Sequence, residues 1–171
     1  MPSPNMRRVE TAVVYPGTCL FEATNLSEGR GTTRPFELIG APYADHRWAD
    51  ALSERNLPGV DFREAYFTPF ISKHVNTSCS GVQLHVTDRD AFEAIPTAIA
   101  MIVTARDLYD GFAWRESTAP FWIDRLSGNE EVRHAIDGGA DVDEVVAVWQ
   151  RDLAAFRRLR EKHLLYPRVR S

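Results

Sequence analysis

The sequence predicts an α/β (α+β) domain in which a small mixed sheet is packed by helices and the carboxy-terminal half is helical. Residues 1 to about 90 are rich in glycine, proline, threonine and aromatic residues, which is typical of loops joined by short strands. Residues from about 95 onward look mostly helical, and between residues 142 and 156 apolar residues recur at three- and four-residue steps, the spacing of a helix with one buried face. A length of 171 residues suits one folded unit, so residues 1–171 are expected to form a single domain.

The best strand candidate is the segment 81–87. Three apolar residues alternate there with three polar ones: Val82, Leu84 and Val86 against Gln83, His85 and Thr87. This period of two predicts that the apolar set faces the core and the polar set faces away from it. Segments 36–39 and 65–71 are further candidates, and Pro69 in the latter indicates an edge strand or a bulge.

Four helices are expected, over about residues 142–163, 130–137, 96–109 and 45–56. The first is the clearest, because Asp141 can cap it and Glu144 can bond back as the reciprocal partner. Pro96 suits the first turn of the third helix, whose apolar sides place it in the core.

The bulk composition narrows the classes of partner. A net charge of −4 with a pI near 5.7 argues against nucleic acid as a partner. The basic carboxy-terminal residues are interrupted by acidic ones and indicate a solvated helix face. No apolar stretch is long enough to span a membrane. The two cysteines, Cys19 and Cys79, make no disulfide framework and are expected to be buried free thiols, although pairing stays open.

The densest polar segment is residues 22–34, which read EATNLSEGRGTTR. Its two glycines let the backbone adopt conformations that other residues avoid and let a ligand approach closely. Arg30 or Arg34 could pair with a carboxylate, and Glu28 could act as an acid, a base or a hydrogen-bond acceptor. A surface loop with internal ion pairs explains the same composition and stays as the alternative.

Two other segments carry side chains with possible chemistry. The first holds Ser72, Lys73, His74, Cys79, Gln83 and His85, and the second is residues 111–115, where aromatic rings flank Arg115. Outward polar positions and core packing are the commoner explanations of these patterns. A zinc site from the two histidines and the cysteine matches no established spacing, so no metal is expected. A Ser72–His74 hydrolase pair lacks the turn that presents a nucleophile.

Two longer runs resemble a known family. They are residues 14–22, reading VYPGTCLFE, and residues 24–36, reading TNLSEGRGTTRPF, with shorter blocks at 67–69, 72–74, 81–88 and 121–128. Over nearly its whole length the chain resembles the carboxy-terminal domain of the NamZ-type exo-β-N-acetylmuramidases, glycoside hydrolase family 171, formerly a domain of unknown function. Phe21, Ala23 and Ala113 stand where that pattern has leucine, glycine and an acidic residue.

The resemblance implies a two-domain enzyme that removes terminal N-acetylmuramic acid from the non-reducing end of peptidoglycan fragments. Its active site would lie in a cleft between a Rossmann-like amino-terminal domain, absent from this chain, and an auxiliary domain like this one. We therefore expect the isolated chain to be inactive and the main catalytic carboxylate to lie in the absent domain. The alternative is a stand-alone module that binds cell-wall sugars. No cofactor, nucleic-acid or membrane partner is expected. A secreted or periplasmic parent fits the substrate, although residues 1–5 carry no signal pattern.

The resemblance also directs attention to particular residues. The expected substrate-binding residues are Asn25, Glu28, Arg30, Thr32, Lys73, His74, Gln83 and His85, and the catalytic candidates are Glu22 and Glu28. Arg30 would pair with the lactyl carboxylate of the sugar. We expect the loop from Asn25 to Arg34 and the strand face with Gln83 and His85 to share one concave surface. An exposed apolar patch is expected close by, around Tyr15, Phe36, Tyr43 and Phe67.

Overall fold

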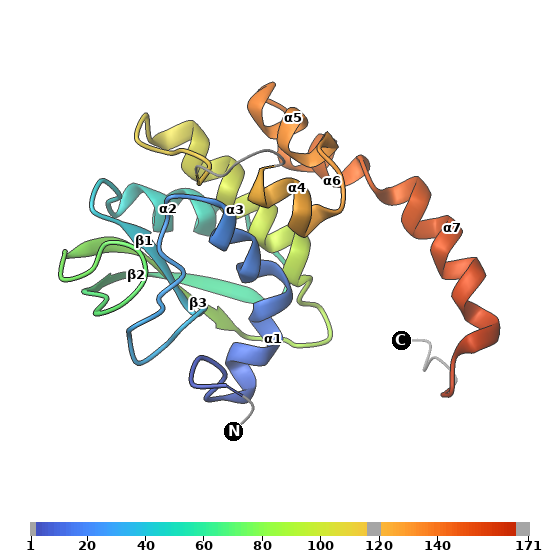
Figure 1. Cartoon of the computed structure of the whole chain (residues 1–171), viewed down its shortest axis with the longest axis horizontal. Helices are drawn as coiled ribbons and strands as arrows, with labels where there is room; N and C mark the ends of the chain where they lie inside the picture. Colours follow the sequence, from blue (N-terminus) through green and yellow to red (C-terminus); the bar gives the residue numbers. More distant parts are fainter. Residues whose placement is uncertain (1–2, 116–120, 167–171) are drawn as a thin grey trace.

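Figure 1 shows the computed structural model, which describes residues 3–115 and 121–166. In chain order the elements are α1 (Val9–Thr18), the 3₁₀ helix η1 (Cys19–Ala23), β1 (Leu38–Ala41), α2 (Arg47–Glu54), β2 (Val60–Phe67), β3 (Cys79–Val86), α3 (Ala94–Leu108), α4 (Trp122–Ser127), α5 (Glu131–Asp137), α6 (Val142–Ala147), α7 (Gln150–Arg160) and the 3₁₀ helix η2 (Glu161–His163). The predicted fold class is confirmed, with the strands in the first half and a helical second half.

The sheet has the order β1-β3-β2, so the strand predicted best lies at its centre. Both pairings are antiparallel, with Gln83 of β3 opposite Leu38 of β1 and Arg63 of β2. The expected mixed sheet is therefore wrong in that detail. The loop of residues 68–78 joins β2 directly to β3, and such a hairpin connection can only produce antiparallel neighbours, since parallel strands need a long crossover. β2 is an edge strand, but it ends at Phe67, so the predicted strand over 65–71 overlaps it only at residues 65–67 and Pro69 lies in the loop that follows.

The core lies between one face of the sheet and the helices α1, α2 and α3. As expected, α3 is central, because every residue from 97 to 105 is buried. Trp48 of α2 is fully buried against it, and its indole N–H donates to the carbonyl of Met101 at 3.2 Å. α1 also lies close to α3, because a Cβ at Gly17 would stand 1.9 Å from the carbonyl oxygen of Ala94. Only glycine permits this approach.

The opposite face of the sheet carries a smaller apolar cluster of Leu38, Ala65, Phe67 and Cys79. Both cysteines are free, as expected, but only Cys79 is buried and Cys19 is half-buried. Burial raises the pKa of the Cys79 thiol to about 11.

Two features of the helices differ from the prediction. α1 was not expected, because Pro16 and Gly17 lie in its last turn and resemble loop residues. The close contact of α1 with α3 outweighs this local preference. The long helix predicted over residues 142–163 divides into α6 and α7 at Val148 and Trp149, after valines whose branched side chains weaken helix formation. The predicted capping box between Asp141 and Glu144 is confirmed, with both bonds at 2.9 Å.

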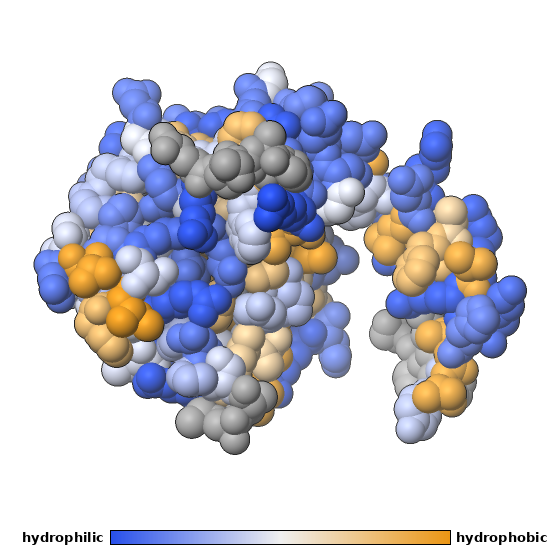
Figure 2. Space-filling view, viewed as in Figure 1, coloured by the Kyte–Doolittle hydropathy of each residue, from blue (hydrophilic) through white to orange (hydrophobic). Residues whose placement is uncertain are grey.

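The last helix, α7, stands away from the rest of the molecule (Figure 1). None of its residues is buried, and apolar side chains show on its surface in Figure 2. Among the described residues, no helix combines the length and the hydropathy that crossing a bilayer requires.

Candidate functional site

The polar segment of residues 22–34, called the polar loop from here on, begins at the end of η1 and leads toward β1. It is largely buried although it has little regular structure. Its backbone is tied to β1 by two hydrogen bonds between Ser27 and Gly40, of 2.7 and 3.1 Å. Gly31 has a φ of 79°, and a Cβ there would stand 2.6 Å from the backbone nitrogen of Ile71. The loop therefore packs directly on the β2–β3 loop, and glycine is required where the two backbones meet.

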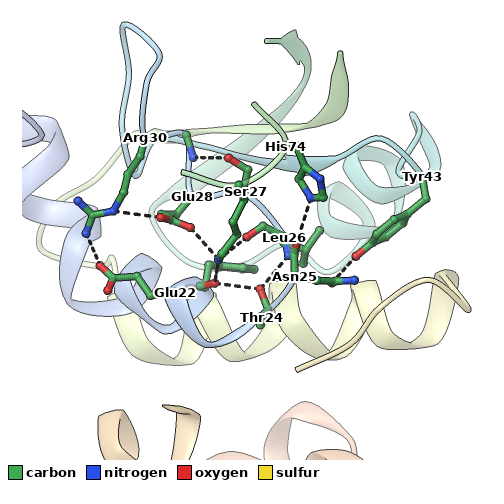
Figure 3. Close-up of polar contacts among 12 residues, drawn as sticks. Glu22, Thr24, Asn25, Leu26, Ser27, Glu28, Arg30, Tyr43 and His74 are labelled. Carbon is green, nitrogen blue, oxygen red and sulfur yellow. Dashed lines mark hydrogen bonds and ion pairs between the residues drawn. The ribbon is translucent and has the colours of Figure 1, made fainter. Parts of the chain in front are cut away.

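Glu28 is the buried centre of this arrangement, with 2% of its surface exposed. Its two carboxylate oxygens bind different cations: Lys73 Nζ at 2.8 Å and Arg30 Nε at 3.0 Å. Figure 3 shows the Arg30 side of this cluster. A buried carboxylate with two cationic partners is suited to holding segments together, because its charge is already compensated.

Lys73 connects the two loops. Besides Glu28, its ammonium group donates to the carbonyl oxygens of Phe21 at 2.6 Å and Leu26 at 2.8 Å, so all three of its donors are used. Burial lowers the pKa of Lys73 against the opposing effect of Glu28, and the nearby charge of Arg115 lowers it further. Four charged groups are thus joined by ion pairs here: the carboxylates of Glu22 and Glu28, and the cations of Arg30 and Lys73.

Arg30 is the part of the cluster that reaches the surface, with 29% of its side chain exposed. Its Nη2 binds Glu22 at 2.6 Å, and its guanidinium lies 4.8 Å from the centre of the Phe36 ring. Burial disfavours the charge of Arg30, but Glu22 and Glu28 outweigh this effect and raise the pKa of the guanidinium. Phe36 itself has a φ of 64°, unusual for a bulky residue and a sign of local strain beneath the loop.

Asn25 forms a second group of contacts, and its side chain points toward other segments of the protein (Figure 3). Its amide nitrogen donates to the carbonyl of Gly111 at 2.7 Å, and its amide oxygen accepts from Tyr43 at 2.7 Å and the Ala113 N–H at 3.2 Å. His74 Nε2 lies 2.7 Å from the Asn25 carbonyl, which can only accept, so this nitrogen carries the proton. Burial raises the pKa of Tyr43 to about 12. Asn25 therefore anchors three segments to the loop.

The β2–β3 loop has a strained backbone and an apolar surface. Ser72, His74 and Asn76 all have φ between 55° and 73°, where side chains other than glycine are disfavoured. Three exposed apolar side chains surround them: Phe70, Ile71 and Val75. Such strain is kept only where surrounding bonds over-determine the conformation, here those of Lys73 and His74.

The structure brings five of the eight expected binding residues together: Asn25, Glu28, Arg30, Lys73 and His74. Thr32 stabilises the turn of the same loop by donating to the carbonyl of Gly29 at 2.6 Å. Within the described part of the chain, no side-chain hydrogen bond links this cluster to Gln83 or His85.

Gln83 and His85 instead line a separate hollow, which also contains Arg34 from the end of the loop and has a volume of about 110 Å³. Gln83 is buried, contrary to a fully outward strand face, because Arg63 covers it and donates to its side-chain oxygen at 2.7 Å. His85 is exposed.

The exposed apolar patch was expected around four aromatic residues, and this is wrong: Tyr15 and Tyr43 are half-buried against the core. Phe36 and Phe67 are buried, 1% and 9% exposed, because they fill the space on either side of the sheet. The exposed apolar side chains beside the polar loop belong to the β2–β3 loop instead. The role of Tyr43 as a partner of Asn25 was not predicted, since this contact across 18 residues appears only once the chain has folded. No group of three His, Cys, Asp or Glu residues that could hold a metal occurs among the described residues.

Comparisons with known proteins agree with one another. The family model for "Exo-beta-N-acetylmuramidase NamZ, C-terminal" matches residues 13–166. The peptidoglycan beta-N-acetylmuramidase NamZ of Bacillus subtilis (strain 168) is 48% identical over 167 residues, which are 97% of this chain and 40% of that protein. Two crystal structures of DUF1343 family proteins from Bacteroides fragilis NCTC 9343 are similar, with TM-scores of 0.86 and 0.71 and identities of 27% and 30%. Each alignment covers 96% of this chain, but only 44% and 43% of those chains.

Proposed function

This chain belongs to the carboxy-terminal family of the NamZ exo-β-N-acetylmuramidases, and we propose that it forms one wall of an interdomain cleft in such an enzyme. In that cleft the enzyme removes terminal N-acetylmuramic acid from peptidoglycan fragments. The chain spans two-fifths of the B. subtilis relative, so the rest of the parent is proposed to supply a Rossmann-like domain and the main catalytic carboxylate. Clefts between domains are common places for ligand sites, which supports this arrangement.

The observation that carries the proposal is the fixed, partly exposed guanidinium of Arg30. Its Nε and one N–H of Nη2 are used by Glu28 and Glu22, so up to three N–H donors are left for a ligand. N-acetylmuramic acid differs from other amino sugars by its lactyl carboxylate, and a guanidinium is well suited to bind a carboxylate. Because two carboxylates and the Phe36 ring hold Arg30 in place, little side-chain entropy is lost on binding.

The charge balance of the cluster supports an anionic ligand. Glu22 and Glu28 are paired with Arg30 and Lys73, and Arg115, whose charge acts on Lys73, adds a further cation nearby. Arg115 is exposed and is held beside the loop by its backbone N–H, which donates to the carbonyl of Ala23 at 2.7 Å.

Glycoside hydrolysis commonly needs two carboxyl groups on either side of the scissile bond. Glu28 is poorly placed for this role, because its side chain is 3% exposed and bound to two cations. Glu22 is more accessible, at 20%, and could assist from this wall of the cleft. We therefore propose Glu28 as a positioning residue for Arg30 and Lys73, and assign the principal carboxylate to the other part of the parent enzyme.

A chimera tests the proposal, in which this chain replaces the matching part of the B. subtilis relative. Arg30→Ala should weaken competitive inhibition by N-acetylmuramic acid by about 1.5–3 kcal/mol, the scale of a hydrogen bond to a charged group. Inhibition by N-acetylglucosamine, which lacks the lactyl carboxylate, should change much less. Arg34→Ala is the control, since Arg34 is 39% exposed and pairs with Glu37. Equal losses for both sugars would mean that Arg30 only holds the loop.

The second candidate function is a module that binds cell-wall sugars without cutting them. The internal pairing of Glu22 and Glu28 favours it, because both carboxylates already serve the loop. We expect the isolated chain to show negligible activity on a chromogenic muramide, and calorimetric titration with N-acetylmuramic acid measures whether it binds alone. Robust turnover by the isolated chain would contradict the two-domain proposal and move catalysis to this loop.

A further inference from the structure

α7 is exposed along most of its length, and only Leu153 and Arg160 are half-buried. None of its eleven residues is buried, and Phe156 and Leu159 are 55% and 60% exposed. These two residues are three positions apart and therefore share one side of the helix. The segment after it continues the apolar surface, with Leu164, Leu165 and Tyr166 exposed by 41%, 90% and 82%. A helix of this length is marginal in water and normally depends on a packed apolar face.

The apolar face of α7 belongs to the part that longer relatives share with this chain. The family match extends to residue 166 and so includes α7. The alignments with both solved structures cover 96% of this chain, which leaves out only about seven of its 171 residues, fewer than the seventeen from Gln150 to Tyr166. In those structures more than half of the polypeptide, outside the 44% and 43% that match, is available to cover the helix.

We propose that α7 is the docking element that holds this part of the enzyme to its amino-terminal domain. The inference rests on the proposed function, because it requires a second domain in the same protein. The apolar side with Phe156 and Leu159 would occupy an apolar groove on that domain. Four arginines, Arg151, Arg157, Arg158 and Arg160, against one acidic residue, Asp152, give α7 an excess of three positive charges. The rim of the groove is therefore expected to carry carboxylates.

The charge of α7 argues against a second copy of this chain as the occupant. In a symmetric dimer the same surface meets itself, so two helices with an excess of positive charge would face each other. Repulsion between them would oppose the gain from burying Phe156 and Leu159. A different, acidic surface within the same polypeptide meets no such opposition.

Limited trypsin digestion tests the proposal, because the arginines of α7 are themselves cleavage sites. In the isolated chain, cleavage after Arg157 and Arg160 should be rapid. In the chimera with the B. subtilis relative, docking should slow it by at least about tenfold, the result of roughly 1.4 kcal/mol of protection when opening is fast relative to cleavage. The variant Phe156→Ser with Leu159→Ser should restore rapid cleavage in the chimera.

The matched control is Gln150→Ser with Ala154→Ser, which places the same residue type on another side of the same helix and leaves all four arginines in place. It should keep the protection.

The outcomes separate docking from the proposed activity. A chimera that is protected but inactive supports docking and contradicts the muramidase proposal. An active chimera in which α7 is cut as fast as in the isolated chain overturns the docking proposal. It is also overturned if the isolated chain protects α7 and sediments as a dimer that Phe156→Ser with Leu159→Ser dissociates, because the occupant is then a second copy.

Discussion

The polar loop and α7 differ in the contacts that stabilise them. The loop has little regular secondary structure, yet its central carboxylate, Glu28, is 2% exposed and paired on both oxygens. α7 has regular helical geometry, yet Phe156 is 55% exposed and no residue of the helix is buried. The comparison shows that a segment is held to the rest of this domain by burial and by paired polar groups. Regular helical structure alone does not do this.

The largest loss in the free energy of unfolding is expected from Lys73→Met. The substitution leaves Glu28 with one cation fewer and removes the Lys73 donor from the Leu26 carbonyl, whereas the Phe21 carbonyl still accepts from Thr24. Removing one partner of a buried pair costs about 3–5 kcal/mol, and we expect about 3 because Arg30 still binds Glu28. Urea unfolding of the isolated chain measures the loss.

The other lysine of the chain, Lys162, is exposed and gives the control. Lys162→Met should change the free energy of unfolding by less than about 0.5 kcal/mol. A double-mutant cycle with Glu28→Gln should show coupling of about 1 kcal/mol or more between Lys73 and Glu28. Additive effects would mean that the two loops are not joined through this pair.

Asn25→Ala is expected to have the next largest effect. It removes the bonds of the side chain to Gly111, Tyr43 and Ala113, at a cost of about 2 kcal/mol in the free energy of unfolding. Tyr43→Phe removes one of these bonds and should cost about 1 kcal/mol. Thermal unfolding of both variants checks the order. A larger loss for Tyr43→Phe would show that the Tyr43 hydroxyl, and not the Asn25 amide, organises this side of the loop.

The free energy of unfolding should also depend on alkaline pH through Cys79, which directly follows the β2–β3 loop. Burial raises its pKa from 9.0 to about 11, so the unfolded chain loses this proton first. The stability that Cys79 contributes is present below pH 9 and is lost as the pH rises to about 11. Between these values the loss is at most about 1.4 kcal/mol per pH unit. Urea unfolding at pH 8, 9 and 10 should show a flatter decline for Cys79→Ala, and parallel declines would contradict the burial of this thiol.

The smallest change in the free energy of unfolding is expected from substitutions in α7. In the isolated chain, Phe156→Ser with Leu159→Ser should change the free energy of unfolding by less than about 0.5 kcal/mol, because neither side chain is buried. Urea unfolding beside the Gln150→Ser with Ala154→Ser control measures this. A loss above 1 kcal/mol would show that α7 packs on its own chain, and the contrast with the loop would disappear.

Local patterns predicted much of the fold. The alternation through Val82 and Leu84 identified the central strand, and the capping box of Asp141 and Glu144 identified the start of α6. α1 could not be predicted in the same way, because Pro16 argues against a helix locally and only the contact of Gly17 with α3 outweighs it. The break before α7 was missed because the apolar spacing continues across it.

The candidate site was predictable in its residue types but not in their pairing. The composition of residues 22–34 pointed to the correct loop, and both interpretations of it, a ligand site and an ion-paired loop, were open. Lys73 and Glu28 are 45 positions apart, and Asn25 and Ala113 are 88 apart. Which partner each polar group finds across such separations depends on the packing of the whole chain. Gln83 was placed on an open face for the same reason, since Arg63 covers it only after β2 and β3 pair.

The pairing of Glu28 with Lys73 also has a consequence for experiments at different ionic strengths. Dissolved ions screen exposed charges but reach a buried pair poorly, and these two side chains are only 3% and 17% exposed. The shape of the loop should therefore stay the same from dilute buffer to concentrated salt. A ligand carboxylate at the exposed edge of Arg30 would feel the added salt directly. If sugar binding weakens as salt is added while the unfolding transition does not move, the salt dependence measures the contact with the ligand and not a change in the loop.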